Sequence, residues 1–194
     1  MTISVIEITT FVPNLIGYTR FILLFASPYF ALSKDMWQYF VICYSLSYLL
    51  DAADGNAARY FNQCSRFGAA LDMVCDRASN ATIYMALGTL YPYLSILFFA
   101  CFVLDFGSHW LQFQSSACMK ATSHKGKNKN ENWLVGLYYN NDTVFKITVP
   151  GAELCSVLLF IQAHMTQLQS NLIWVVVLGV LCLILTFKMI VNVF

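Results

Sequence analysis

The chain has 194 residues, of which 59% are hydrophobic and only 11% are charged, and its mean hydropathy is +0.62. Soluble domains carry about 25% charged residues, so this composition excludes an ordinary soluble protein and indicates a polytopic membrane protein. The formal net charge of +1 favours no class of partner. The length leaves room for about six spans of roughly 20 residues each. We therefore expect one all-α transmembrane domain over residues 1–194.

Hydropathy divides the chain into six apolar stretches. We expect spans near residues 12–32, 37–61, 66–90, 92–119, 143–164 and 170–192. Pro13 is typical of the first turn of a helix, and the residues before it are expected to form a short interfacial helix. Short turns are expected near Tyr91 and over residues 166–170. Residues 120–142 form the one long polar connection.

Lysine and arginine residues set the expected topology, because cytoplasmic loops are enriched in them. With six spans, both termini and the second-to-third and fourth-to-fifth connections lie on one side of the membrane. The basic residues on or near that side are Arg20, Arg59, Arg66, Arg77, Lys120, Lys125, Lys127, Lys129, Lys146 and Lys188. Only Lys34 falls on the other side. We therefore expect both termini to be cytoplasmic.

Four aspartates interrupt the second and third apolar stretches, in the run DAADGNAARYFNQCSRFGAALDMVCD. Insertion of one carboxylate at bilayer depth costs roughly 2.5–3.5 kcal/mol, so four carboxylates together need a cation to offset their charge. Asp51 and Asp54 are spaced i, i+3 and Asp72 and Asp76 are spaced i, i+4, so each pair shares a helix face. If the chain reverses around Gln63, both pairs lie roughly 12–20 Å from the turn and reach a similar depth on facing helices.

Carboxylate oxygens in this number suit Mg²⁺ or Mn²⁺ and are numerous enough to hold two ions. Two such metals are a known arrangement for displacement at phosphorus. Gly55 and Gly68 leave room for a closely approaching ligand. Arg59, just over one turn past Asp54, offers a guanidinium fork for a phosphate. The pattern thus indicates a metal-dependent phosphate site.

Two other interpretations of the aspartates remain open. One is a set of interhelical salt bridges with Arg59, Arg66 and Arg77, although four acids interleaved with glycines exceed what helix pairing needs. The other is a divalent-cation channel, a transporter or a proton pathway, since intramembrane acids also serve there. A channel, a transporter or a proton pathway does not explain the spacing of the glycines and arginines.

The seven cysteines contain no C-x-x-C pair, so we expect no zinc site.

The aspartate run resembles the signature of the CDP-alcohol phosphotransferase family, D-x2-D-G-x2-A-R-x8-G-x3-D-x3-D. The matching fixed positions are Asp51, Asp54, Gly55, Ala58, Arg59, Gly68, Asp72 and Asp76. The resemblance extends to the eukaryotic members that make phosphatidylinositol, through VPNLIGYTR at 12–20, FGAALDMVCDR at 67–77 and DFGSHWLQFQSS at 105–116. The resemblance does not extend to the last expected span, which is generic apolar sequence.

This resemblance implies transfer of a phosphatidyl group from CDP-diacylglycerol to myo-inositol, with release of CMP. The implied metal ligands are Asp51, Asp54, Asp72 and Asp76, with Asp76 also the proton acceptor; the implied nucleotide contacts are Gly55, Arg59 and Ser65. A six-helix homodimer among membrane lipids is implied as well, in the endoplasmic reticulum with the active site facing the cytosol. We expect no nucleic-acid partner. The shared signature alone leaves glycerol phosphate and serine open as acceptors.

Candidate acceptor contacts lie outside the aspartate run, at Asp105, His109, Lys125 and Glu153. Asp105 and His109 are spaced i, i+4 in the fourth span, where a structural pair and an inositol contact are both open interpretations. Glu153 lies in the middle of the fifth span. Lys125 belongs to a lysine-rich stretch whose main expected role is at the lipid surface. Arg20 in the first span either lines the headgroup site, pairs with an aspartate or extends to the interface.

Overall fold

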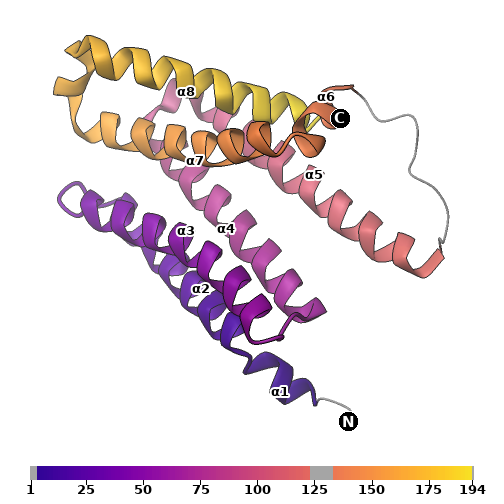
Figure 1. Cartoon of the computed structure of the whole chain (residues 1–194). Helices are drawn as coiled ribbons and strands as arrows, with labels where there is room; N and C mark the ends of the chain where they lie inside the picture. Colours follow the sequence, from indigo (N-terminus) through magenta and orange to yellow (C-terminus); the bar gives the residue numbers. More distant parts are fainter. Residues whose placement is uncertain (1–3, 123–132, 194) are drawn as a thin grey trace. The chain divides into compact units, whose positions relative to one another are not determined.

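The structure, a computed structural model, describes residues 4–122 and 133–193, and every regular element among them is a helix (Figure 1). The all-α class expected from the sequence is confirmed over these residues. The chain divides into two compact units, Met1–Ala86 and Leu87–Phe194. Each unit contains some of the candidate site residues that the sequence predicts.

The first unit contains α1 (Val5–Thr9), α2 (Val12–Ala31), α3 (Trp37–Tyr60) and most of α4 (Arg66–Leu90). A capping box starts α1: Ser4 Oγ accepts from Glu7 N at 3.2 Å, and Glu7 Oε2 accepts from Ser4 N at 2.8 Å. Pro13 lies in the first turn of α2, as expected, where its missing N–H leaves no helical bond unmade. The Tyr18 hydroxyl donates to Thr9 O at 3.1 Å and so ties α2 to α1.

Helices α2 and α3 lie side by side, in indigo and violet in Figure 1. Leu24 of α2 and Phe40 and Tyr44 of α3 are almost completely buried, and the rings of Phe40 and Tyr44 stack with centroids 5.8 Å apart. Gly17 of α2 allows α4 to approach closely, because a Cβ at this position would lie 2.8 Å from Leu71 Cδ2. Small residues at such contacts are typical of helices that pack within a membrane.

The turn between α3 and α4 reverses the chain where the sequence predicts it. Asn62 adopts a left-handed conformation with φ 53°. The side chain of Gln63 accepts a hydrogen bond from Val12 N at 2.9 Å, which fastens the turn to the start of α2. Ser65 caps α4, since its Oγ accepts from Gly68 N at 2.9 Å. These contacts of Gln63 and Ser65 therefore hold the turn that joins α3 to α4 in place.

The second unit contains the end of α4, the short helix η1 (Pro92–Leu94), α5 (Ser95–Thr122), α6 (Trp133–Asn140), α7 (Asp142–His164), η2 (Thr166–Ser170) and α8 (Leu172–Val191). Helices α7 and α8 lie side by side, in orange and yellow in Figure 1. Their contact includes the buried side chains of Cys155, Leu178 and Leu181. The Tyr91 hydroxyl donates to Leu159 O at 2.9 Å and anchors the turn before η1 to α7.

The helix α6 differs from the expectation of one continuous polar connection over residues 120–142. Its sequence, WLVGLYYN, is mostly apolar and follows the polar lysine-rich stretch. Tyr138 of α6 is buried and packs against Phe145 of α7 and Phe187 of α8, with ring centroids 5.4 and 6.5 Å apart. This aromatic contact explains why the end of the connection folds back onto the second unit as a helix.

Among the described helices, three are long and apolar enough to cross a membrane: residues Pro92–Ser116 of η1 and α5, α7, and α8. Helices α2, α3 and α4 contain 20, 24 and 25 residues and match the predicted span boundaries closely. They carry the asparagine, arginine and aspartate residues of the candidate site, which lower their mean hydropathy. The expectation of six spans with cytoplasmic termini therefore stays a prediction.

Candidate active site

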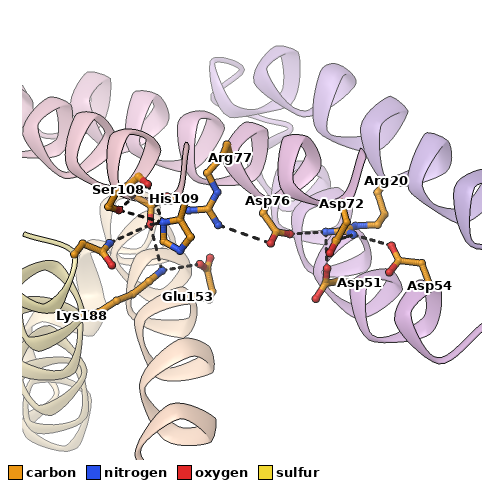
Figure 2. A network of polar contacts seen from close by, with 12 residues as sticks. Arg20, Asp51, Asp54, Asp72, Asp76, Arg77, Ser108, His109, Glu153 and Lys188 are labelled. Carbon is orange, nitrogen blue, oxygen red and sulfur yellow. Dashed lines mark hydrogen bonds and ion pairs between the residues drawn. The ribbon is translucent and has the colours of Figure 1, made fainter. Parts of the chain in front are cut away.

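The guanidinium group of Arg20 contacts all four aspartates of the signature run (Figure 2). Its Nη1 lies 2.7 Å from Asp54 Oδ2 and 2.8 Å from Asp72 Oδ1. Its Nη2 lies 2.8 Å from Asp51 Oδ1 and 2.8 Å from Asp76 Oδ1. Each terminal nitrogen thus joins one carboxylate of α3 to one of α4. The predicted convergence of the four aspartates on facing helices is confirmed.

The structure decides between roles that the sequence left open for Arg20. Only 2% of this residue is exposed, so it does not extend to the membrane interface, and it pairs with aspartates. The salt-bridge interpretation had assigned the pairing to other arginines, of which Arg77 approaches Asp76 at 3.7 Å. Within this cluster, four carboxylates face the two guanidinium groups of Arg20 and Arg77, which leaves an excess of negative charge.

The chemistry of the cluster fits a divalent metal. Asp51, Asp72 and Asp76 each offer an oxygen, and these ligand atoms all lie within 4.8 Å of one another. Hard carboxylate oxygens are the ligands that Mg²⁺ and Mn²⁺ prefer. Asp54 lies outside this group of three and is the most buried of the four aspartate side chains, with 11% of its side chain exposed. The residues present therefore suit a cation held mainly by Asp51, Asp72 and Asp76.

A pocket of about 190 Å³ adjoins the cluster within the first unit. Asp54 and Asp72 line one part of it, and the predicted nucleotide contacts Gly55, Arg59 and Ser65 line another. Asn14 of α2 also lines the pocket, while its side-chain amide donates a hydrogen bond to Ile8 O. The remaining lining residues are Pro13, Gly17, Ala58, Gln63, Cys64, Gly68, Ala69 and Leu71. Residues from α2, α3, α4 and the turn between α3 and α4 thus line an open pocket in contact with two of the aspartates.

The two glycines of the signature have different surroundings. A Cβ at Gly68 would lie 2.9 Å from Asn14 Oδ1 and 3.2 Å from Ser65 Oγ, so this glycine is required by packing. Among the described residues, a Cβ at Gly55 would meet only the Arg59 guanidinium, at 3.6 Å, which is an ordinary contact. The protein's own packing therefore does not require glycine at position 55. Its position on the pocket wall favours a reason that involves a ligand.

Arg59 and Ser65 also have partners of their own in the first unit. Arg59 Nη2 donates to Asn56 Oδ1 at 2.8 Å, one turn earlier in α3. Ser65 Oγ is occupied as the cap of α4. These bonds hold both side chains at the pocket, and the Ser65 hydroxyl still has a proton to donate because its oxygen acts only as acceptor toward Gly68 N.

A second polar cluster lies in the second unit (Figure 2). Lys188 of α8 has its Nζ 3.7 Å from Asp105 Oδ1 of α5 and 3.6 Å from Glu153 Oε1 of α7. His109 lies one turn after Asp105, with its Nδ1 2.8 Å from the Asp105 carbonyl oxygen and 3.8 Å from Asp105 Oδ1. Asn192 Nδ2 donates to Asp105 Oδ1 at 3.4 Å. Three of the four candidate acceptor residues are therefore gathered in one place.

Lys188 is the residue that the sequence reasoning missed in this cluster. The last span was interpreted as generic apolar sequence, with Lys188 counted only as a topological signal. In the structure its side chain is 6% exposed and lies between two acidic residues. A single charge within the apolar sequence LIWVVVLGVLCLILTFKMIV is the signal that identifies it. Lys125, the fourth candidate acceptor residue, lies outside the described residues.

The fold and site together define a helical protein with helices long and apolar enough to span a membrane and a carboxylate cluster suited to metal-dependent phosphate chemistry. A family model described as CDP-alcohol phosphatidyltransferase matches residues 10–182. The chain belongs to this family. No solved structure matches the chain.

Individual curated relatives of the chain have a more specific name than the family. Over 153 residues the chain is 41% identical to a Schizosaccharomyces pombe protein named CDP-diacylglycerol–inositol 3-phosphatidyltransferase, a match that covers 78% of this chain and 63% of the relative. Relatives with the same name in Candida albicans and Homo sapiens are each 40% identical, over 73% and 80% of this chain and 61% and 72% of their own lengths. The chain thus spans less than two thirds of the length of the two fungal relatives.

Proposed function

We propose that the protein transfers a phosphatidyl group from CDP-diacylglycerol to myo-inositol, producing phosphatidylinositol and CMP. The observation that carries the proposal is the convergence of Asp51, Asp54, Asp72 and Asp76 beside a pocket lined by the other signature residues. The names of the curated relatives support the choice of inositol as the acceptor alcohol.

The donor's nucleotide and diphosphate would occupy the pocket of the first unit. Arg59 supplies a guanidinium fork and Ser65 a hydroxyl proton, and both groups recognise phosphate oxygens. Gly55 leaves the wall of the pocket open to close approach of the ligand. The acyl chains of the donor would remain among membrane lipids, which would account for a phosphate site on helices at the predicted bilayer depth.

Asp51, Asp54, Asp72 and Asp76 would hold two Mg²⁺ or Mn²⁺ ions, whose charge stabilises the negative charge that develops on the diphosphate oxygens. Asp76 accepts the proton of the inositol hydroxyl. The hydroxyl oxygen forms a bond to the phosphorus that carries the diacylglycerol, and the bond from this phosphorus to the oxygen of CMP breaks. The electron pair of the broken bond leaves with CMP.

The cluster in the second unit would bind the acceptor. Inositol is a neutral polyol, so its hydroxyl groups need both hydrogen-bond acceptors and donors. Asp105 and Glu153 supply acceptor oxygens, and His109 supplies a ring nitrogen. Lys188 neutralises part of the charge of the two acids, which makes the cluster less attractive to a second cation. Lys125 is a further candidate contact from the sequence.

The proposal includes the setting of the enzyme in the cell. Hydropathy supports six spans, and the distribution of lysine and arginine supports cytoplasmic termini and an active site that opens to the cytosol. The resemblance of the sequence to the phosphatidylinositol-forming members of the family implies an endoplasmic-reticulum location and a homodimer. A divalent-cation channel or transporter is the rival from another class, and it predicts metal flux without release of CMP.

An acceptor panel tests the proposal. Purified protein in lipid vesicles receives CDP-diacylglycerol, Mg²⁺ or Mn²⁺, and one labelled alcohol at a time: myo-inositol, serine or glycerol phosphate. We expect label to enter lipid only with inositol, with one CMP released per lipid formed. Incorporation of serine or glycerol phosphate without inositol would show a different acceptor. Metal flux without any CMP would instead support the rival.

A further inference from the structure

We propose that Arg20 is a positioning residue that assembles the four carboxylates before metal binds, and that its guanidinium group gives way when metal binds. The inference rests on the metal site of the proposed function, but it does not depend on the acceptor. It assigns Arg20 two opposing effects: the residue stabilises the metal-free site and lowers the affinity of that site for metal.

The assembling role follows from the contacts that the Arg20 guanidinium makes with all four aspartates. One terminal nitrogen joins Asp54 to Asp72, and the other joins Asp51 to Asp76, each contact being 2.7 or 2.8 Å (Figure 2). Each bridge crosses from α3 to α4. Without a cation, four carboxylates gathered at this depth repel one another, because like charges at a few ångströms interact strongly away from bulk water. Arg20 therefore holds α3 and α4 in the register that places the aspartates together.

The competing role follows from where the guanidinium lies. The ligand oxygens of Asp51, Asp72 and Asp76 lie within 4.8 Å of one another, and a small divalent ion has its ligands at about 2.0–2.1 Å. An ion among these oxygens needs the space next to the same carboxylates that Arg20 contacts at 2.8 Å. A dication and a guanidinium this close repel each other. The two cations therefore compete for the aspartates.

The way Arg20 is bonded makes its release feasible. Its contacts with the aspartates are all made by the two terminal nitrogens, whereas the buried Nε has no hydrogen-bond partner among the described residues. A bound metal would replace the ionic contacts that the carboxylates lose. The inner part of the Arg20 side chain is held by packing alone, so the guanidinium can leave without breaking a further hydrogen bond of this kind.

The test compares Mn²⁺ binding in the intact protein and in Arg20→Gln, both in lipid nanodiscs without substrate. Free Mn²⁺ is counted by electron paramagnetic resonance during a titration, and thermal unfolding is measured with and without Mn²⁺. We expect Arg20→Gln to bind Mn²⁺ about tenfold more tightly, equivalent to about 1.4 kcal/mol. We also expect it to unfold at a lower temperature than wild type without metal, and this deficit to shrink at saturating Mn²⁺.

The matched control is Arg66→Gln, which removes the same charge from the exposed first residue of α4. We expect its Mn²⁺ affinity to stay within about twofold of wild type, because exposed charges are screened. A purely structural role for Arg20 predicts the opposite sign, namely weaker Mn²⁺ binding in Arg20→Gln. Weaker or unchanged binding in this variant would overturn the proposal.

A second measurement keeps the proposal testable if Arg20→Gln does not fold without metal. Wild-type protein with ¹⁵N-labelled arginine is titrated with diamagnetic Mg²⁺, and the Arg20 guanidinium resonances are assigned by comparison with Arg20→Lys. We expect these resonances to shift and to show faster rotation of the guanidinium as Mg²⁺ saturates the site. Unchanged Arg20 resonances at saturation would overturn the release of the guanidinium. Phosphatidylinositol formation by wild type is measured separately, so a failure of the inference is distinguishable from a failure of the proposed function.

Discussion

Lys188 of α8 lies 3.7 Å from Asp105 of α5, and only 6% and 1% of their side chains are exposed. The same lysine lies 3.6 Å from Glu153 of α7. A lysine in this position neutralises part of the charge of two acids that would otherwise be buried together. Three helices of the second unit are therefore joined by one ionic cluster.

Replacing this lysine should affect both stability and acceptor binding. In Lys188→Met the carboxylate of Asp105 loses the ammonium group of Lys188, and breaking a buried pair costs roughly 3–5 kcal/mol. We expect a clearly lower unfolding temperature, a raised KM for inositol and an unchanged KM for CDP-diacylglycerol. Lys188→Arg retains the charge and should recover most of the stability.

The control for this prediction is Lys146→Met. Lys146 forms an i, i+4 pair with Asp142 at 3.8 Å, but both side chains are largely exposed, at 75% and 88%. This variant should behave like wild type in all three measurements, because exposed pairs contribute little. An equal rise of both substrate KM values in Lys188→Met would argue against a role of the cluster in acceptor binding.

Gly55→Ala should separate ligand binding from stability. In the described part of the chain the new methyl group would meet only the Arg59 guanidinium, at an ordinary distance, and alanine is about 1 kcal/mol more favourable than glycine inside a helix. We expect unchanged or higher thermal stability together with a rise of roughly tenfold or more in the KM for CDP-diacylglycerol. Steady-state kinetics and thermal unfolding of the same preparation check both expectations.

Gly107→Ala in α5 is the matched control for the glycine prediction, because a Cβ at Gly107 would have no neighbour within 4 Å among the described residues. It should show the same gain from helix propensity without a change in KM. If Gly55→Ala retains the wild-type KM, Gly55 does not lie against the donor and the pocket must be assigned differently.

The predicted topology can be checked by labelling single cysteines. Cys64 is exposed in the turn between α3 and α4, which we expect on the cytosolic side, and Lys34 lies in the preceding connection, which we expect on the opposite side. Each position is tested alone, in an otherwise cysteine-free chain, with a membrane-impermeant maleimide on sealed microsomes. We expect Cys64 to react without detergent and Lys34→Cys to react only after detergent is added. Reaction of both without detergent would contradict an odd number of spans between them.

The helices were predictable because their signals are local. The expected spans at 12–32 and 37–61 correspond to α2 and α3 within one residue at each end, and Pro13 marks the start of α2. The turn around Gln63 follows from the loss of apolar residues between two long apolar stretches. The helix α6 was not predicted, because its formation depends on the packing of Tyr138 against residues of α7 and α8, which no local pattern reveals.

The candidate site was predictable as far as its spacing determines its geometry. The i, i+3 and i, i+4 spacings place Asp51 with Asp54 and Asp72 with Asp76, and a reversal between them brings the pairs together. The partner of the aspartates was not determined in this way, since Arg20 comes from another helix and had three open interpretations. Lys188 was missed because its acidic partners, Asp105 and Glu153, are distant in sequence.

The most direct measurement is the formation of CMP from CDP-diacylglycerol and myo-inositol by purified wild-type protein and by Asp76→Asn. We expect wild type to release CMP in step with phosphatidylinositol, and the variant to be slower by about 10²–10⁴-fold, because the proton of the attacking hydroxyl has lost its acceptor. Asp142→Asn, which changes an exposed aspartate in the first turn of α7, is the control and should retain full activity. Substantial CMP formation by a correctly folded Asp76→Asn protein would contradict the assignment of the aspartate cluster as the catalytic centre.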